Sequence, residues 1–85
     1  MKNWMLVCCY ERDIEAPRFF KSKDEAVEAM CKDVADYIDF TTEEIMDARL
    51  DGVKIDNSTI VGDDYAYSDR HAYCDWKIFN IGGDI

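Results

Sequence analysis

The residues best suited to chemistry lie near the C-terminus, where His71 and Cys74 form an H-x-x-C pattern. Four aspartates lie close to this pattern: Asp63, Asp64, Asp69 and Asp75. A zinc site normally takes four ligands, mostly Cys and His, and this chain has a single histidine. The segment 63–69 also lacks the glycine and the spacing of an EF-hand loop. We therefore predict a solvated acidic loop with no metal and no cofactor. The alternative, a cation-binding or redox site at His71 and Cys74, predicts metal retained through purification.

Catalysis needs a positioned nucleophile or an acid–base pair, and His71 is the only histidine for either role. Its partner would be Ser58, Ser68 or a cysteine, and no G-x-S-x-G, Walker A or G-x-G-x-x-G pattern is present. Nineteen Asp and Glu create carboxylate pairs by chance, and 85 residues are too few to enclose a deep cleft. The sequence therefore predicts a protein that is not an enzyme.

Acidity is the most informative bulk property of the chain. Nineteen Asp and Glu face ten Lys and Arg, giving a formal net charge of −9 at pH 7. Nucleic-acid affinity comes mainly from cations that neutralise phosphates, so direct DNA or RNA binding is disfavoured, as is docking on anionic lipid. Basic protein surfaces and divalent cations are the favoured targets. Acidity that serves solubility alone is the simpler interpretation, and it stays open.

An acidic row within residues 23–40, which we predict to be helical, gives part of this charge a location. Residues three or four apart on a helix lie about 5–6 Å from each other, so the acids form a stripe. Its members are Glu25, Glu28, Asp36 and Asp39. Such a stripe could occupy a cationic groove that normally holds a nucleic-acid backbone. Lys32 lies in the same stripe and can pair with Glu28, which is typical of an ordinary solvated face.

A second candidate surface combines aromatic and acidic side chains near the C-terminus. Its aromatic members are Tyr65, Tyr67, Tyr73 and Trp76, of which Trp76 is expected in the core. Aromatic residues are enriched at protein interfaces. With the helical stripe, the predicted partner-binding residues are Glu25, Glu28, Asp36, Asp39, Asp63, Asp64, Tyr65, Tyr67 and Asp69.

A small-ligand site is the alternative function for the tyrosine-rich region. A homodimer interface could enclose a pocket there that binds or sequesters a nucleotide. The phosphates would then depend on the few available cations: Arg12, Arg18, Arg70 and Lys77. A third interpretation is a housekeeping domain without a specialised site.

The cysteines fit a structural role better than a chemical one. Cys8 and Cys9 are adjacent, and neighbours on a strand point to opposite faces, so they cannot easily share a metal or a disulfide. Free cysteine behaves as a small buried hydrophobe, which is the role expected for Cys8, Cys9 and Cys31. No signal peptide or membrane span is predicted. We therefore expect free thiols and a cytoplasmic location.

The helices and strands that position these residues are predicted from the periodicity of apolar residues and from helix-capping residues. Ser22 and Glu25 form a capping box, and apolar residues at helical spacing extend this helix to about Phe40. Thr41 begins a second, short helix, and Gly52 is placed to end it. Strands are predicted over residues 4–10, 18–20, 53–55, 59–61, 63–67 and 72–81, with a turn at 11–17, a loop at 68–71 and a frayed tail at 82–85.

This pattern predicts a single α+β domain spanning residues 1–85. A hydrophobic fraction of 48% is high enough for a real core and excludes intrinsic disorder. The expected architecture is a small antiparallel sheet with one long and one short helix packed on one face, in the order β-β-α-α-β-β(-β).

Three segments together resemble a group of small acidic proteins from Gram-positive gut bacteria and their prophages. The segments are Lys2-Asn3-Trp4, Phe20-x-Ser22-x-x-Glu25-Ala26, and Asp64-x-Ala66 with Tyr73-Cys74-Asp75-Trp76-Lys77-Ile78. The resemblance spans most of the chain, but its motifs are structural and no functional residue is carried over. It implies a mobile-element origin, where small acidic proteins include inhibitors of host defence such as anti-CRISPRs. The expected function is thus a non-enzymatic module that occupies a basic, nucleic-acid-binding surface of a protein partner.

Overall fold

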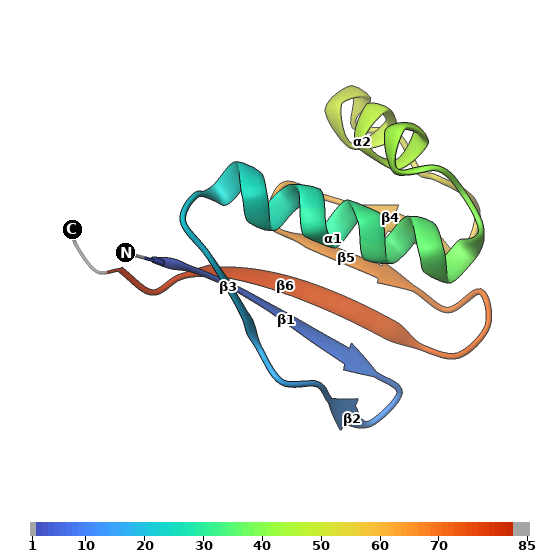
Figure 1. Cartoon of the computed structure of the whole chain (residues 1–85). Coiled ribbons are helices and arrows are strands. Elements are labelled where there is room, and N and C mark those ends of the chain that lie inside the picture. Colours follow the sequence, from blue (N-terminus) through green and yellow to red (C-terminus); the bar gives the residue numbers. More distant parts are fainter. Residues whose placement is uncertain (1, 83–85) are drawn as a thin grey trace.

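Strands lie at both ends of the chain and two helices lie between them in the computed structural model, which describes residues 2–82 (Figure 1). The fold is α+β in the order β-β-β-α-α-β-β-β, as the sequence predicts in class. The elements are β1 (Trp4–Tyr10), β2 (Asp13–Ile14), β3 (Arg18–Phe20), α1 (Lys23–Ile38), α2 (Thr42–Asp51), β4 (Thr59–Val61), β5 (Tyr65–Ser68) and β6 (Cys74–Asn80).

The sheet is antiparallel, and β1 with β6 forms its centre. Its strand order is β2-β1-β6-β5-β4, and β3 also pairs with β1. β1 pairs with β6 over its whole length, from Trp4 opposite Asn80 to Tyr10 opposite Cys74. Its other edge is shared, because β3 pairs with its first half and β2 with its last two residues. A continuous antiparallel ladder of backbone hydrogen bonds therefore joins the first and the last strand of the chain.

The caps fix the two helices where the sequence predicts them. The Ser22 side chain accepts a hydrogen bond from the Glu25 amide, and the Glu25 carboxylate accepts from the amide of Lys21. α1 ends at Ile38 because Asp39 adopts the left-handed conformation. The capping box of α2 is complete between Thr41 and Glu44, and Gly52 ends that helix at φ 70°.

Some predicted strand boundaries are wrong. Residues 53–55 form no strand, because the Val53 amide donates to the Ala48 carbonyl and closes α2. Ser68, predicted in a loop, ends β5, where its hydroxyl bonds that of Thr59 at 2.8 Å in the core. Of the predicted tail, Gly82 is described and its amide donates to Asn80, whereas residues 83–85 lie outside the described residues.

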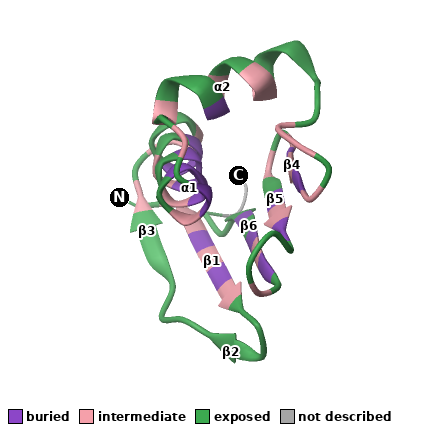
Figure 2. Ribbon diagram, turned by 90° about the vertical axis from the view of Figure 1, so that its right-hand side faces the viewer, coloured by how far each residue is buried: buried purple, intermediate pink, exposed green. Residues whose placement is uncertain are grey.

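The core lies between α1 and one face of the sheet (Figure 2). α1 contributes Ala26, Val27, Met30, Cys31, Val34, Ala35 and Ile38, and the sheet contributes Leu6, Cys8, Val61, Ala66, Cys74, Trp76 and Ile78. α2 packs against α1 and the edge strand β4 and buries Ile45. Trp76 is in the core, as predicted. Both helices therefore lie on one side of the sheet (Figure 1), and most of the acids they carry are exposed.

Candidate functional site

Charge is distributed unevenly between the helices and the rest of the chain. Residues 23–51, which contain both helices, hold ten Asp and Glu but only three Lys and Arg, a formal net charge of −7. The remaining residues hold nine acids and seven bases, a net charge of −2. Nine of the ten acids in 23–51 are exposed. We call this part of the surface the acidic helical layer.

The stripe predicted on α1 lies in this layer. Glu25, Glu28, Asp36 and Asp39 are all exposed, and so is Lys32 between them. The Glu25 carboxylate is used by the helix cap. Among residues 2–82, no hydrogen bond or ion pair involves the carboxylates of Glu28, Asp36 or Asp39. These three carboxylates are therefore free to meet an external cation.

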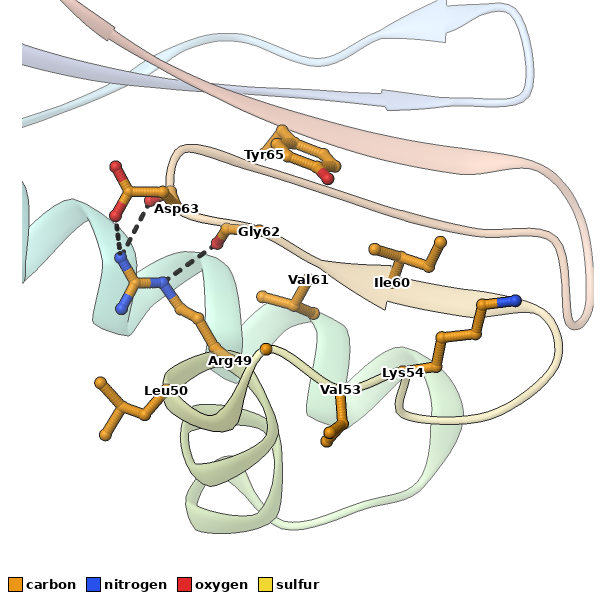
Figure 3. Close-up of a pocket in the computed structure, with 10 residues that line it drawn as sticks. Arg49, Leu50, Val53, Lys54, Ile60, Val61, Gly62, Asp63 and Tyr65 are labelled. Atoms are coloured by element: carbon orange, nitrogen blue, oxygen red, sulfur yellow. Dashed lines mark hydrogen bonds and ion pairs between the residues drawn. The ribbon is translucent and has the colours of Figure 1, made fainter.

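The two other cations of the layer, Lys23 and Arg49, both pair with the carboxylate of one aspartate. Arg49 donates to the carbonyl of Gly62, and to both the carbonyl and the carboxylate of Asp63, at 2.8–3.0 Å (Figure 3). Lys23 reaches the same carboxylate at 2.6 Å. The hydrogen bond from Lys23 is the main cause that lowers the Asp63 pKa. Asp63 therefore joins both helices to the β4–β5 turn.

The remaining predicted residues do not form one acidic surface with the stripe. Asp64 is paired with Lys77 at 3.0 Å, and Asp69 is exposed beside β5. Tyr65 and Tyr67 lie on β5 at the positions that alternate with buried Ala66 and Ser68. Because strand neighbours point to opposite faces, these tyrosines start from the sheet face opposite α1. The Tyr65 ring lies against Gly62 and also lines the pocket beside α2. The structure thus separates the predicted set into an acidic side and an aromatic side.

A shallow pocket lies where α2 meets β4, and Figure 3 shows its lining. It has a volume of about 570 Å³, and Leu50 and Val53 contribute apolar side chains that are 75% and 54% exposed. The Arg49 guanidinium already donates hydrogen bonds to the Gly62 and Asp63 carbonyls and to the Asp63 carboxylate. The pocket therefore places exposed apolar side chains at the border of the acidic helical layer.

Sequence reasoning missed a groove between α1 and the β1–β3 edge of the sheet. The groove has a volume of about 580 Å³ and is lined by Cys8, Tyr10, Glu15, Ala16, Arg18, Asp33, Asp36, Tyr37, Cys74 and Trp76. Asp36 of the predicted stripe is in its wall. No pattern in the sequence marks this groove, since its lining comes from four separate segments.

Aromatic rings and carboxylates give the groove its chemistry. The ring of Tyr37 makes T-shaped contacts with the rings of Tyr10 and Trp76, at centroid-to-centroid distances of 5.9 and 6.1 Å. Arg18 is ion-paired with Asp33, which leaves Glu15 and Asp36 as the uncompensated charges of the wall. A cation is attracted by both carboxylates and aromatic faces. The groove is therefore suited to a cationic group.

The three buried thiols are poor nucleophiles. Cys8, Cys31 and Cys74 are buried, as predicted for the first two, whereas Cys9 is only half-buried on the opposite side of the sheet. Burial raises the pKa of the Cys8, Cys31 and Cys74 thiols above its usual range, which favours the unreactive protonated form. Cys8 and Cys74 lie 3.6 Å apart, sulfur to sulfur, in the core. A catalytic thiolate is not favoured at these positions.

His71 and Cys74 do not lie in a cluster of metal ligands. His71 is exposed and its ring contacts Tyr37, whereas Cys74 is buried against Cys8. Within residues 2–82, no three His, Cys, Asp or Glu side chains are arranged to hold a metal ion.

Comparisons with protein-family models, curated proteins and solved structures give no match for this chain. In the described part of the chain, neither helix has the length and apolar character to cross a membrane. The interpretation of function consequently rests on surface charge and on the groove.

Proposed function

We propose that this chain is a non-enzymatic binding module whose acidic helical layer binds a basic surface of a protein partner. The observation that carries the proposal is the concentration of −7 of the −9 net charge in residues 23–51, with nine exposed acids. A surface charged with one sign attracts a partner of the opposite sign and speeds its association. The same charge repels nucleic acid and anionic lipid directly.

The groove supplies a specific contact within this broad attraction. A Lys or Arg side chain of the partner would enter between Tyr10 and Tyr37, with Glu15 and Asp36 near its charged end. Cation–π contacts contribute about 0.5–2 kcal/mol, more when the site excludes water. Such an anchor would distinguish one basic partner from another, which a smooth charged face does poorly.

An inhibitor is the form of this function that we favour. A row of carboxylates on a helix can take the place of phosphates in a basic groove, and a protein that handles nucleic acid provides such a groove. The resemblance to small acidic prophage proteins agrees with that role, including an anti-CRISPR-like one. The partner would then lose its nucleic acid when this chain binds.

The nucleotide-binding alternative has weaker support. Three of the four cations that it needs are already ion-paired: Arg18 with Asp33, Arg70 with Asp56, and Lys77 with Asp64. Opening these pairs to accept a phosphate would leave their aspartates close to it. A thermal-shift screen with nucleotides tests this alternative, since a bound ligand raises the unfolding temperature.

The proposed function is tested by retention of host proteins at rising salt on two immobilised variants. E28Q/D36N/D39N removes three free carboxylates of the helical layer, and E11Q/D13N/D69N removes three exposed ones elsewhere. Both variants raise the net charge by the same amount. We expect the first to lose a basic, nucleic-acid-binding protein that the control and the wild type retain at low salt. The proposal is contradicted if retention of the partner does not depend on salt concentration, or if both variants lose the partner equally.

A further inference from the structure

The sheet face opposite the helices is a second surface, and among residues 2–82 no element covers it (Figures 1 and 2). We call it the outer sheet face. Strand alternation and register place its side chains in three rows across the strands. The rows are Phe19–Met5–Phe79, Val7–Lys77–Tyr65 and Cys9–Asp75–Tyr67–Ile60. Tyr73 extends the face at the start of β6, where its ring lies 6.2 Å from that of Tyr67.

Large aromatic side chains dominate this face and are exposed. Phe19, Tyr65, Tyr73 and Phe79 are 42–48% exposed. An aromatic side chain has about 150–250 Å² of surface, so these four leave roughly 350 Å² uncovered. Half-buried Met5, Val7 and Tyr67 enlarge the patch. The largest apolar patch on a typical monomer is about 300–600 Å² and is often functional, so this face is a candidate interaction site.

The charges of the outer sheet face are self-complementary. Lys77 and Asp75 are the two charged residues of the three rows, and they lie two residues apart on β6. Within one copy Lys77 also pairs with Asp64 at 3.0 Å, and the Tyr73 hydroxyl donates to Asp75 at 3.1 Å. A two-fold axis between them would bring Lys77 of each copy to Asp75 of the other. Interfaces between identical chains require such a pattern, because the same patch meets itself. A single-sign charge at this place would instead repel a second copy.

The position of the helices removes the main obstacle to self-association, the net charge of −9. Most of that charge is in the acidic helical layer, on the far side of each sheet. Two sheets stacked face to face lie about 10 Å apart, and both helical layers then point outward. The two acidic helical layers are thus separated by the thickness of both sheets, and salt weakens the repulsion between them further.

We propose that the outer sheet face binds a second copy of this chain and forms a two-fold symmetric, sheet-on-sheet homodimer. The patch is smaller than the roughly 800 Å² per partner of a standard interface. The dimer is accordingly reversible and depends on protein concentration. It presents two acidic helical layers in opposite directions. This inference does not depend on the proposed function, since the outer sheet face contains none of the groove or stripe residues.

Sedimentation equilibrium over a range of concentrations tests the dimer with three variants. D75K and K77D each place like charges on both sides of the axis, so we expect each to weaken the dimer about tenfold or more. The triple variant D64N/D75K/K77D exchanges the two charges and removes the carboxylate that pairs with Lys77 in the wild type. It restores self-complementarity, so its dissociation constant should return towards that of the wild type. Circular dichroism and thermal unfolding confirm that each variant is folded.

Two further measurements make the result decisive. F79S removes an aromatic side chain from the patch and should also weaken the dimer, whereas E28Q/D36N/D39N on the helical layer should leave it unchanged or stronger. A wild type that sediments as a monomer at every concentration overturns the proposal. So does a dimer that the single charge variants leave intact, or one that the triple variant D64N/D75K/K77D fails to restore.

Discussion

Arg49 and Asp63, fourteen residues apart, are joined twice, because one guanidinium nitrogen donates to both the carboxylate and the backbone carbonyl of the aspartate. A second nitrogen donates to the carbonyl of Gly62 (Figure 3). The Arg49 side chain is only 16% exposed. This contact ties the last turn of α2 to the turn between β4 and β5, and it fixes the position of a helix that carries much of the acidic layer.

Replacing Arg49 by alanine should lower the free energy of unfolding by about 1–3 kcal/mol, because the carbonyls of Gly62 and Asp63 lose their donor. Urea denaturation at neutral pH measures this change. Lys54→Ala is the matched control, since Lys54 lines the same pocket and is exposed. We expect that control to stay within about 0.5 kcal/mol of the wild type. Equal stability of the two variants would show that the Arg49 contact is dispensable.

Asp63 should make the fold sensitive to acid. Lys23 and then Arg49 lower the Asp63 pKa below its unfolded value, so the folded state favours the carboxylate. Its stabilising contribution is complete above the unfolded pKa, near pH 4, and is lost as the pH falls through the folded pKa. Asp63→Asn should therefore show a smaller loss of stability between about pH 5 and 2 than the wild type. Asp69→Asn, at an exposed aspartate, should keep the wild-type acid profile.

Local signals in the sequence predict most of the fold. The capping residues Ser22 and Thr41 and the left-handed Gly52 set the helices, and alternation sets β1. The sequence does not predict β2, because a strand of two residues is too short to show an alternating pattern. Ser68 is misplaced because its polarity suggests a loop, whereas its buried hydroxyl is satisfied by Thr59.

The surfaces are less predictable than the elements. The exposure of the α1 stripe follows from helical period, but the pairing of Asp63 with Lys23, forty residues away, depends on the packed fold. The groove needs Tyr10, Glu15 and Tyr37 to meet, and nothing in their spacing indicates that they do. The outer sheet face depends on register across β1, β6 and β5, which a sequence read one strand at a time does not give.

Tyr37 should be the strongest polar anchor of the groove wall. Its hydroxyl donates to the Ala72 carbonyl and accepts from the Ala72 amide at 2.8 Å. Tyr37→Phe leaves both backbone groups without this partner, so we expect a loss of about 1–2 kcal/mol in urea denaturation. Tyr10→Phe keeps the ring contact with Tyr37 and should cost less than about 0.5 kcal/mol. A Tyr37→Phe protein as stable as the wild type would contradict this role.

The capping box of α2 should contribute measurably to stability. Thr41→Ala removes the side-chain acceptor of the Glu44 amide, and we expect a cost of about 1 kcal/mol. The neighbouring Thr42→Ala is the control, because Thr42 is the first helical residue and caps nothing. A helix that carries Glu43 and Asp47 should fray with the cap, so the Thr41→Ala protein should also show faster amide exchange in α2.

Thiol reactivity should distinguish the two sides of the sheet. Cys8, Cys31 and Cys74 are buried and burial raises their pKa, so at pH 8 they should react with a disulfide reagent only when the fold opens. Cys9 is half-buried on the outer sheet face and should react first in dilute protein. Cys9→Ser should remove the fast phase, and the remaining phase should accelerate with urea.

The same fast phase reports on the homodimer. Cys9 stands in the row of Asp75, inside the proposed interface, so its reaction should slow as protein concentration rises. In K77D, where the dimer is weakened, the rate should stay high at every concentration. If the reaction rate of Cys9 in the wild type does not change with protein concentration, the proposed dimer is contradicted. The exposure of the outer sheet face, which the structure shows, would still stand.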